Sequence, residues 1–140
     1  MHVEQAQVVR APREQVFEAW TDYEAWPRFS GLFTRVSVKE RAGNTVHVIA
    51  EIKVMGRRTA RSERHVLTPP EQVRVEGETE GATNGTLWTF EPVPEGTRLT
   101  AVVDADLGAV TRLLGPLARR QVQTMLRDWM QGLARYVEAK

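Results

Sequence analysis

The sequence contains no cysteine and only three histidines, and its charges are nearly balanced. The absence of cysteine excludes disulfide bonds, thiolate metal sites and cysteine nucleophiles. His2, His47 and His65 are widely separated and form neither an HxH nor an HExxH pattern, so we expect no metal site. The 19 basic and 18 acidic residues are interspersed and leave a net charge of +1, so we do not expect nucleic acid as a partner.

Long apolar runs and common catalytic signatures are also missing. No apolar stretch approaches about 18 residues, and the first residues lack the apolar run of a signal peptide, so we expect a cytoplasmic protein without a transmembrane segment. The strings GxSxG, GxGxxG and GxxxxGK do not occur. The sequence therefore predicts no nucleophile elbow, no nucleotide-binding loop and no cofactor.

The composition is that of an ordinary globular domain, with a hydrophobic fraction of 41% and a charged fraction of 26%. A chain of this length buries roughly two-thirds of the surface that its unfolded form exposes, which is enough for a sizeable core. No linker, repeat or low-complexity segment divides it, so we expect one domain over residues 1–140.

The order of elements begins with a strand and two short helices. Residues 2–10 have β character, and Pro12 suits the first turn of a helix over residues 13–20. A second short helix around residues 23–26 should end at Pro27, because proline cannot continue a helix.

A long β region and a final helix follow. We expect six strands, at residues 33–40, 45–54, 57–67, 72–80, 86–90 and 98–107. Short turns join these strands, which favours antiparallel pairing because parallel strands need long crossovers. Apolar spacing predicts a long helix over residues 109–137, kinked or interrupted by Gly115 and Pro116.

This order predicts an α+β fold in which one helix covers a wide sheet. Seven strands about 4.8 Å apart span roughly 30 Å, whereas a helix is about 10–12 Å across. The sheet must therefore curve around the helix, with the two short helices closing one side. Such an arrangement leaves a cavity, which we expect to measure on the order of 300–1,000 Å³.

Several local strings carry a resemblance to a known family over the whole chain. They are AP at residues 11–12 before VF at 16–17, then Asp22 and WP at 26–27, GTLWTFEP at 85–92, EGTRLT at 95–100 and LARYVE at 133–138. In these strings the chain resembles the START/Bet v 1-like (SRPBCC) superfamily, in particular its bacterial polyketide cyclase/dehydrase and coenzyme-Q-binding-like branch. The resemblance implies a helix-grip fold and a hydrophobic cavity for lipids, quinones or polyketides. Because the strings concern turns and packing, no catalytic residue is carried over.

Strand alternation predicts which side chains face the cavity. The inward sets on three strands are Val46, Val48, Ala50, Ile52 and Val54; Asn84, Thr86, Trp88 and Phe90; and Leu99, Ala101, Val103 and Ala105.

The strand over residues 57–67 has two possible registers. We favour the one that turns Ala60, Ser62, Arg64 and Val66 inward. The other register buries Arg61, Glu63 and His65, which is costly unless these side chains pair.

The candidate ligand-binding residues combine aromatic side chains, methionines and one arginine. They are Trp26, Phe29, Phe33, Arg64, Trp88, Phe90, Met125, Trp129 and Met130. Aromatic rings and adaptable methionines commonly line sites for small apolar ligands. An inward Arg64 would anchor a carboxylate, carbonyl or phosphate through its fork of donors.

The leading functional hypothesis is a binding or carrier module for an apolar small molecule. The first alternative is a polyketide aromatase/cyclase or dehydratase, which needs an acid or base in the cavity. The favoured inward sets supply only serine, threonine and asparagine besides Arg64, so binding ranks first. The second alternative is a protein- or ribosome-interaction module. The sequence leaves the ligand and the oligomeric state open.

Overall fold

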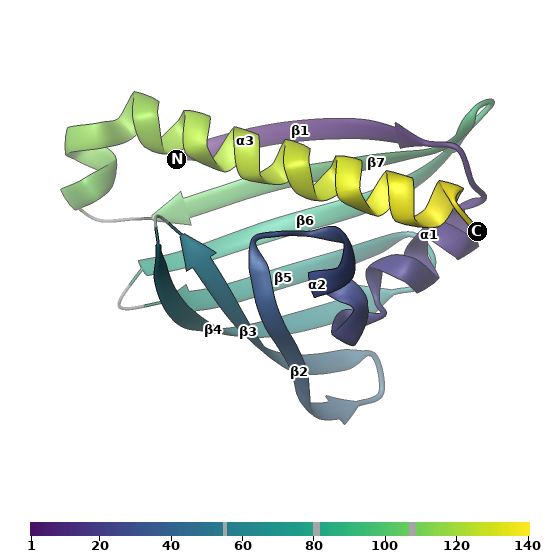
Figure 1. The fold of residues 1–140 in the computed structure, drawn as a ribbon, viewed down its shortest axis with the longest axis horizontal. Helices are drawn as coiled ribbons and strands as arrows, with labels where there is room; N and C mark the ends of the chain where they lie inside the picture. The colour runs from purple at the N-terminus through teal and green to yellow at the C-terminus, as the bar shows by residue number, and fades with distance from the viewer. Residues whose placement is uncertain (55, 80–81, 107–108) are drawn as a thin grey trace.

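The structure is a computed structural model that describes residues 1–54, 56–79, 82–106 and 109–140 (Figure 1). Its elements in chain order are β1 (His2–Val9), α1 (Arg13–Trp20), the 3-10 helix η1 (Tyr23–Ala25), α2 (Trp26–Phe29), β2 (Phe33–Ala42), β3 (Thr45–Val54), β4 (Arg57–Thr68), β5 (Gln72–Thr79), β6 (Ala82–Val93), β7 (Gly96–Asp106) and α3 (Ala109–Glu138).

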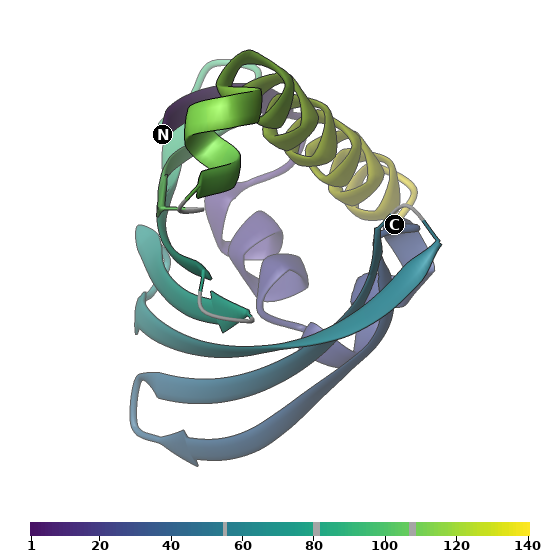
Figure 2. The same ribbon diagram turned by 90° about the vertical axis from the view of Figure 1, so that its left-hand side faces the viewer.

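The seven strands form a sheet in the order β1-β7-β6-β5-β4-β3-β2, and every neighbouring pair is antiparallel. Figure 2 shows how strongly this sheet curves, with α3 lying across its open side and α1 inside the curve. The predicted helix-grip architecture is confirmed. One helix covers a seven-stranded sheet because the sheet bends around it.

The two short helices are present, but the second continues past the residue that was expected to end it. Pro12 precedes α1 with φ of −60°, the value that a helix start requires. The predicted end at Pro27 is wrong, because Pro27 lies in the first turn of α2, which runs to Phe29. A first-turn residue has no intrahelical partner for its N–H, so proline costs nothing there.

The last helix agrees with its prediction, and one late strand is longer than expected. Pro116 lies inside α3, and the first turns of α3 run at an angle to the rest, as the predicted kink near Gly115 and Pro116 requires (Figure 1). β6 starts earlier than predicted, because Gly85 pairs with Glu76 on one side and Asp104 on the other. The predicted strand ends at residues 80 and 107, and the side chain of Val54, lie outside the described residues.

The inner face of the sheet agrees with strand alternation on three strands. The described inward sets of β3 and β7 are buried, and on β6 burial deepens from a half-buried Asn84 to buried Thr86, Trp88 and Phe90. These side chains form most of the sheet's share of the hydrophobic core.

All four tryptophans of the chain meet where the helices pack on the sheet. We call Trp20 (α1), Trp26 (α2), Trp88 (β6) and Trp129 (α3) the tryptophan cluster. Ring centroids are 5.2 Å apart for Trp20 and Trp26, 5.5 Å for Trp20 and Trp88, and 4.9 Å for Trp88 and Trp129. The indole N–H of Trp26 donates to the carbonyl oxygen of Trp20 at 2.8 Å. Because its members come from four elements, the cluster ties the helices to the sheet.

Helices α2 and α3 approach each other closely at Gly132. A Cβ atom on this buried residue would collide with the backbone carbonyl group of Phe29. In contrast, a Cβ on Gly115 of the same helix would meet no atom within 4 Å other than those of its chain neighbours. The two glycines therefore differ in whether a side chain would collide with another element.

Gly132→Ala should destabilise the protein by about 1–3 kcal/mol, because α3 must move away from α2. Gly115→Ala should have the smaller effect, because the helix preference of alanine is opposed only by the ring of the next residue, Pro116. Urea unfolding followed by circular dichroism measures both values. Stabilisation by Gly132→Ala would show that α2 and α3 do not meet this closely.

Candidate ligand-binding site

A cavity of about 280 Å³ lies between the concave face of the sheet and α3. Its volume is just below the range of about 300–1,000 Å³ that is usual for small-molecule sites. The lining consists of Met1, Trp20, Trp26, Leu32, Phe33, Arg61, Glu63, His65, Val75, Asn84, Thr86, Trp88, Val103, Ala105, Val122, Met125, Leu126 and Trp129. Most of these side chains are apolar, and the charged side chains among them belong to β4.

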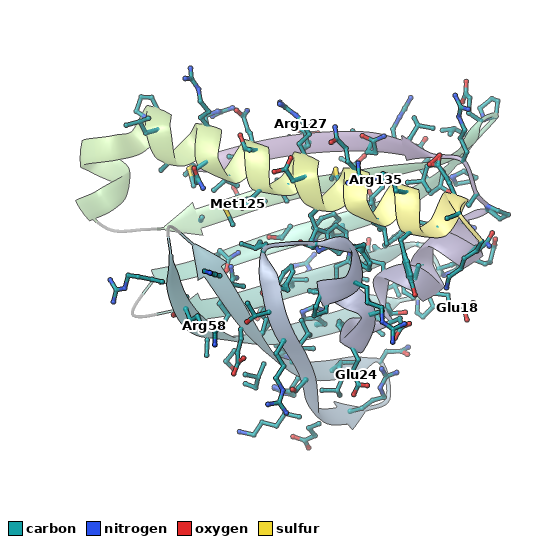
Figure 3. The ribbon with its side chains drawn as sticks, viewed as in Figure 1. Glu18, Glu24, Arg58, Met125, Arg127 and Arg135 are labelled. Carbon is teal, nitrogen blue, oxygen red and sulfur yellow. The ribbon has the colours of Figure 1, made fainter. Side chains whose placement is uncertain are left out.

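The helical wall of the cavity comes from the middle of α3. Val122, Met125 and Leu126 are half-buried, while Trp129, one turn further on, is buried and belongs to the tryptophan cluster. Figure 3 shows Met125 on the side of α3 that faces the strands and Arg127 on the opposite side. Helical periodicity thus turns an apolar face toward the cavity and leaves the arginine in solvent.

Strand β4 presents its charged residues to the cavity. Arg61, Glu63 and His65 point inward, and the exposed fractions of Glu63 and His65 are 7% and 0%. Their neighbours on β3 are Ala50, Val48 and Val46, all of which are buried. Directly paired residues share a sheet face, so this pairing places the three polar side chains inside.

The favoured inward placement of Arg64 is therefore wrong. Its side chain is 52% exposed on the outer face and lies 3.6 Å from the carboxylate of Glu76. Ala60 and Ser62 are exposed as well, and Val66 is half-buried. The expected cost of burying the alternative set is avoided because its members pair with one another.

The buried polar groups form a continuous chain. The Tyr23 hydroxyl lies 3.0 Å from His65 Nδ1, and His65 Nε2 lies 3.0 Å from Glu63 Oε1. Arg61 Nη2 is 3.2 Å from Glu63 Oε2 and also donates to Asn84 Oδ1. An ionised carboxylate only accepts hydrogen bonds, so His65 donates to Glu63 from Nε2; in the neutral ring, Nδ1 then accepts the Tyr23 hydroxyl proton.

Burial raises the pKa of the Glu63 carboxyl, but the hydrogen bond from His65 and the charge of Arg61 outweigh it and leave this pKa below its ordinary value. Burial also raises the pKa of Tyr23 far above its ordinary value. Glu63 is therefore ionised and Tyr23 protonated near neutral pH, as the hydrogen-bond chain requires.

The pairing of strands arranges the lining from polar to apolar. One row across the sheet joins Glu63, Gly77 and Asn84, and the row four residues further along β4 joins Leu67, Val73 and Trp88. At about 3.3 Å per residue the two rows are roughly 13 Å apart. The cavity therefore has a polar end at Glu63 and Asn84 and an aromatic end at Trp88.

The structure brings five of the nine candidate residues to the cavity wall: Trp26, Phe33, Trp88, Met125 and Trp129. Phe90 and Met130 are 2% and 0% exposed in the core and are not part of the wall. Phe29 is also outside the wall and stacks on Tyr136 with centroids 5.2 Å apart. Contact of the five residues with a ligand stays a prediction.

Sequence reasoning missed Trp20, Arg61, Glu63 and His65 as cavity residues. A signal for the last three was available, because Val54 and Arg57 pair across a connection of only two residues. Paired residues share a face, so an inward position for Val54 assigns residues 57, 59, 61, 63 and 65 to the same side. No comparable local signal distinguishes Trp20 from an ordinary core residue.

Within the described part of the chain, no group of three or more His, Asp or Glu side chains could hold a metal ion. No helix in the same part combines the length and hydrophobicity needed to cross a bilayer.

The fold and this cavity define a helix-grip protein, and comparison with known families agrees. The family described as polyketide cyclase / dehydrase and lipid transport matches residues 1–138. The chain belongs to this family, in agreement with the polyketide cyclase/dehydrase branch that its sequence strings resemble. No curated protein matches the sequence significantly.

Solved structures share the fold at low sequence identity. A protein from Thermus thermophilus is 22% identical, with 99% of this chain and 98% of that chain covered and a TM-score of 0.91. The ZhuI aromatase/cyclase from Streptomyces sp. R1128 is 17% identical, with 99% and 93% covered and a TM-score of 0.81. A START superfamily protein from Mycobacterium smegmatis is 16% identical, with 99% and 97% covered and a TM-score of 0.83. At these identities the likeness concerns the fold alone.

The lowered pKa of Glu63 predicts a pH-dependent contribution to stability. Because the folded-state pKa lies below the ordinary value of 4.5, the Glu63 carboxylate stabilises the fold fully above that pH. The contribution is lost as pH falls through the folded-state pKa. The difference in unfolding free energy between wild type and Glu63→Gln should therefore be large at pH 7 and shrink toward pH 3.

Urea unfolding at a series of pH values measures this difference. Glu76→Gln is the control, because Glu76 is the exposed partner of Arg64 on the outer face. The control should stay parallel to wild type at every pH. A difference between wild type and Glu63→Gln that stays constant with pH would contradict the ionised, hydrogen-bonded state of Glu63.

Proposed function

We propose that the protein binds an apolar small molecule in the cavity between the sheet and α3. The observation that carries this proposal is the 280 Å³ space itself, which has an aromatic end and a small number of polar groups on one wall. Small-molecule sites are typically lined in this way, because apolar walls supply affinity and a few polar groups fix orientation. Membership of a family whose description includes lipid transport supports the same function.

The ligand should enter with its polar group at the Glu63–Asn84 row and its apolar body against Trp88. Arg61 lies at the polar end with a side chain that is 20% exposed, so part of it still meets solvent. Its Nε is buried and has no hydrogen-bond partner among the described residues. The guanidinium carries further N–H donors besides Nη2, and Arg61 is part of the cavity wall, so an oxygen on the ligand can accept a hydrogen bond from the accessible part of the group.

A compound that fits should raise the melting temperature. At 100 times its dissociation constant, a ligand stabilises the folded state by about 2.7 kcal/mol, which means several degrees for a domain of this size. We expect such shifts within a panel of quinones, aromatic ketones and fatty acids. Native mass spectrometry of protein purified from its own host identifies the natural ligand directly.

Arg61→Lys tests the site without removing the charge beside Glu63. Lysine lacks the guanidinium fork, so affinity for a ketone such as 2-acetonaphthone should fall roughly tenfold. Arg64→Lys is the matched control on the outer face of the same strand and should bind as wild type does. Equal affinities for wild type and Arg61→Lys would show that Arg61 does not contact the ligand, and the absence of any melting shift across the panel would overturn the binding proposal.

A second candidate is an enzyme that moves protons on a bound ketone. It is favoured by Glu63 and His65, which supply in the cavity wall the acid and base groups that the favoured sequence register lacked. Against it, both ring nitrogens of His65 and Oε1 of Glu63 already have hydrogen-bond partners. Binding therefore remains the first proposal.

Exchange of the methyl protons of 2-acetonaphthone in D₂O separates the two functions. A catalytic base would remove a proton next to the carbonyl, the electron pair would move to the oxygen near Arg61, and a deuteron would return from solvent. Catalysis of this kind is worth roughly 100-fold or more over buffer, and Glu63→Gln would abolish it. The binding proposal expects the exchange rate measured by NMR to equal that in buffer.

A further inference from the structure

We infer that Glu63 makes the cavity selective for neutral, oxygen-bearing ligands over carboxylates, by cancelling the charge of Arg61. This inference rests on the proposed binding function. It divides the compounds that the cavity would otherwise accept into two classes, because quinones and ketones are neutral and fatty acids are ionised near neutral pH.

The two opposite charges occupy the same end of the cavity. Arg61 Nη2 and Glu63 Oε2 are 3.2 Å apart, and Glu63 is held there from its other side by His65. A second carboxylate reaching for Arg61 would also lie close to the carboxylate of Glu63. The attraction to one and the repulsion from the other nearly cancel at similar distances.

The cancelled charge leaves a carboxylate with no compensation for its lost hydration. Moving an ionised group out of water is costly unless it finds an uncompensated opposite charge. A ketone or quinone oxygen loses far less hydration on entry. It can nevertheless accept a hydrogen bond from the accessible part of the guanidinium group, because the partners of Arg61 among the described residues occupy only Nη2.

The strand next to β4 leaves space for this arrangement. Gly77 lies opposite Glu63 on β5, and a Cβ there would come within 2.5 Å of Arg61 Nη2 and 2.9 Å of Asn84 Oδ1. The absent side chain thus lets the guanidinium reach Asn84 and stay beside Glu63. The position of Arg61 is determined by three neighbouring strands rather than by one flexible contact.

Two pairs of probes match in shape and differ in charge: 2-acetonaphthone with 2-naphthoate, and 2-undecanone with decanoate. Isothermal titration calorimetry at pH 8 gives the ratio of ketone affinity to acid affinity within each pair. In wild type we expect the ketone to bind at least about tenfold more tightly, which corresponds to ~1.4 kcal/mol. Glu63→Gln should reverse the preference in favour of the acid, because it leaves Arg61 as an uncompensated positive charge.

Two further variants allow the inference to be tested even if Glu63→Gln does not fold. Arg61→Gln leaves Glu63 alone, so the ratio should move further toward the ketone. The double variant Arg61→Gln/Glu63→Gln removes both charges, so it should prefer the ketone as wild type does. Thermal melts confirm that each variant is folded at the temperature of the titration.

The outcomes separate this inference from the proposed function. The inference is wrong if wild type binds the acids as tightly as the ketones. It is also wrong if the ratio of ketone affinity to acid affinity is the same in wild type and in all three variants. In both cases binding in the cavity stands. If wild type binds no member of either pair, nor any compound of the melting panel, the proposed function fails together with the inference.

Discussion

A buried carboxylate is the constraint on which the arrangement of this cavity depends. Glu63 faces the interior with 7% of its surface exposed, and an ionised group in that position requires partners. Arg61 and His65 provide them from the same face of β4, and His65 is held in turn by Tyr23 of η1. The strand register, the seating of the short helices and the polar end of the cavity are therefore mutually dependent.

The opposite end of the cavity depends on the tryptophan cluster. Its rings come from α1, α2, β6 and α3, so the same contacts hold the helices on the sheet and form the aromatic end of the cavity. Large rings that pack edge to face leave irregular space beside them, whereas small aliphatic side chains could close it. Stability and the capacity for a ligand thus share the same residues.

The fold was predictable because it depends on signals that repeat along the chain. Alternation of apolar residues predicted the strands, short turns predicted that they pair antiparallel, and helical spacing predicted α3.

The site was less predictable, because hydrophobicity alone favoured the wrong register for β4. Arg61, Glu63 and His65 look unsuitable for a core one at a time, and only their mutual pairing makes burial acceptable. The position of Trp20 at the cavity follows from packing across four elements, which no local sequence pattern shows.

The central claim is that the polar end at Glu63 and the aromatic end at Trp88 orient a ligand. A crystal structure of the protein with 2-acetonaphthone bound tests this most directly. We predict the ketone oxygen within hydrogen-bond distance of Arg61 and the naphthalene ring against Trp88 and Trp129. A ring placed at the Glu63–Asn84 row with the oxygen among the tryptophans, or a ligand bound only on the outer surface, would contradict the account.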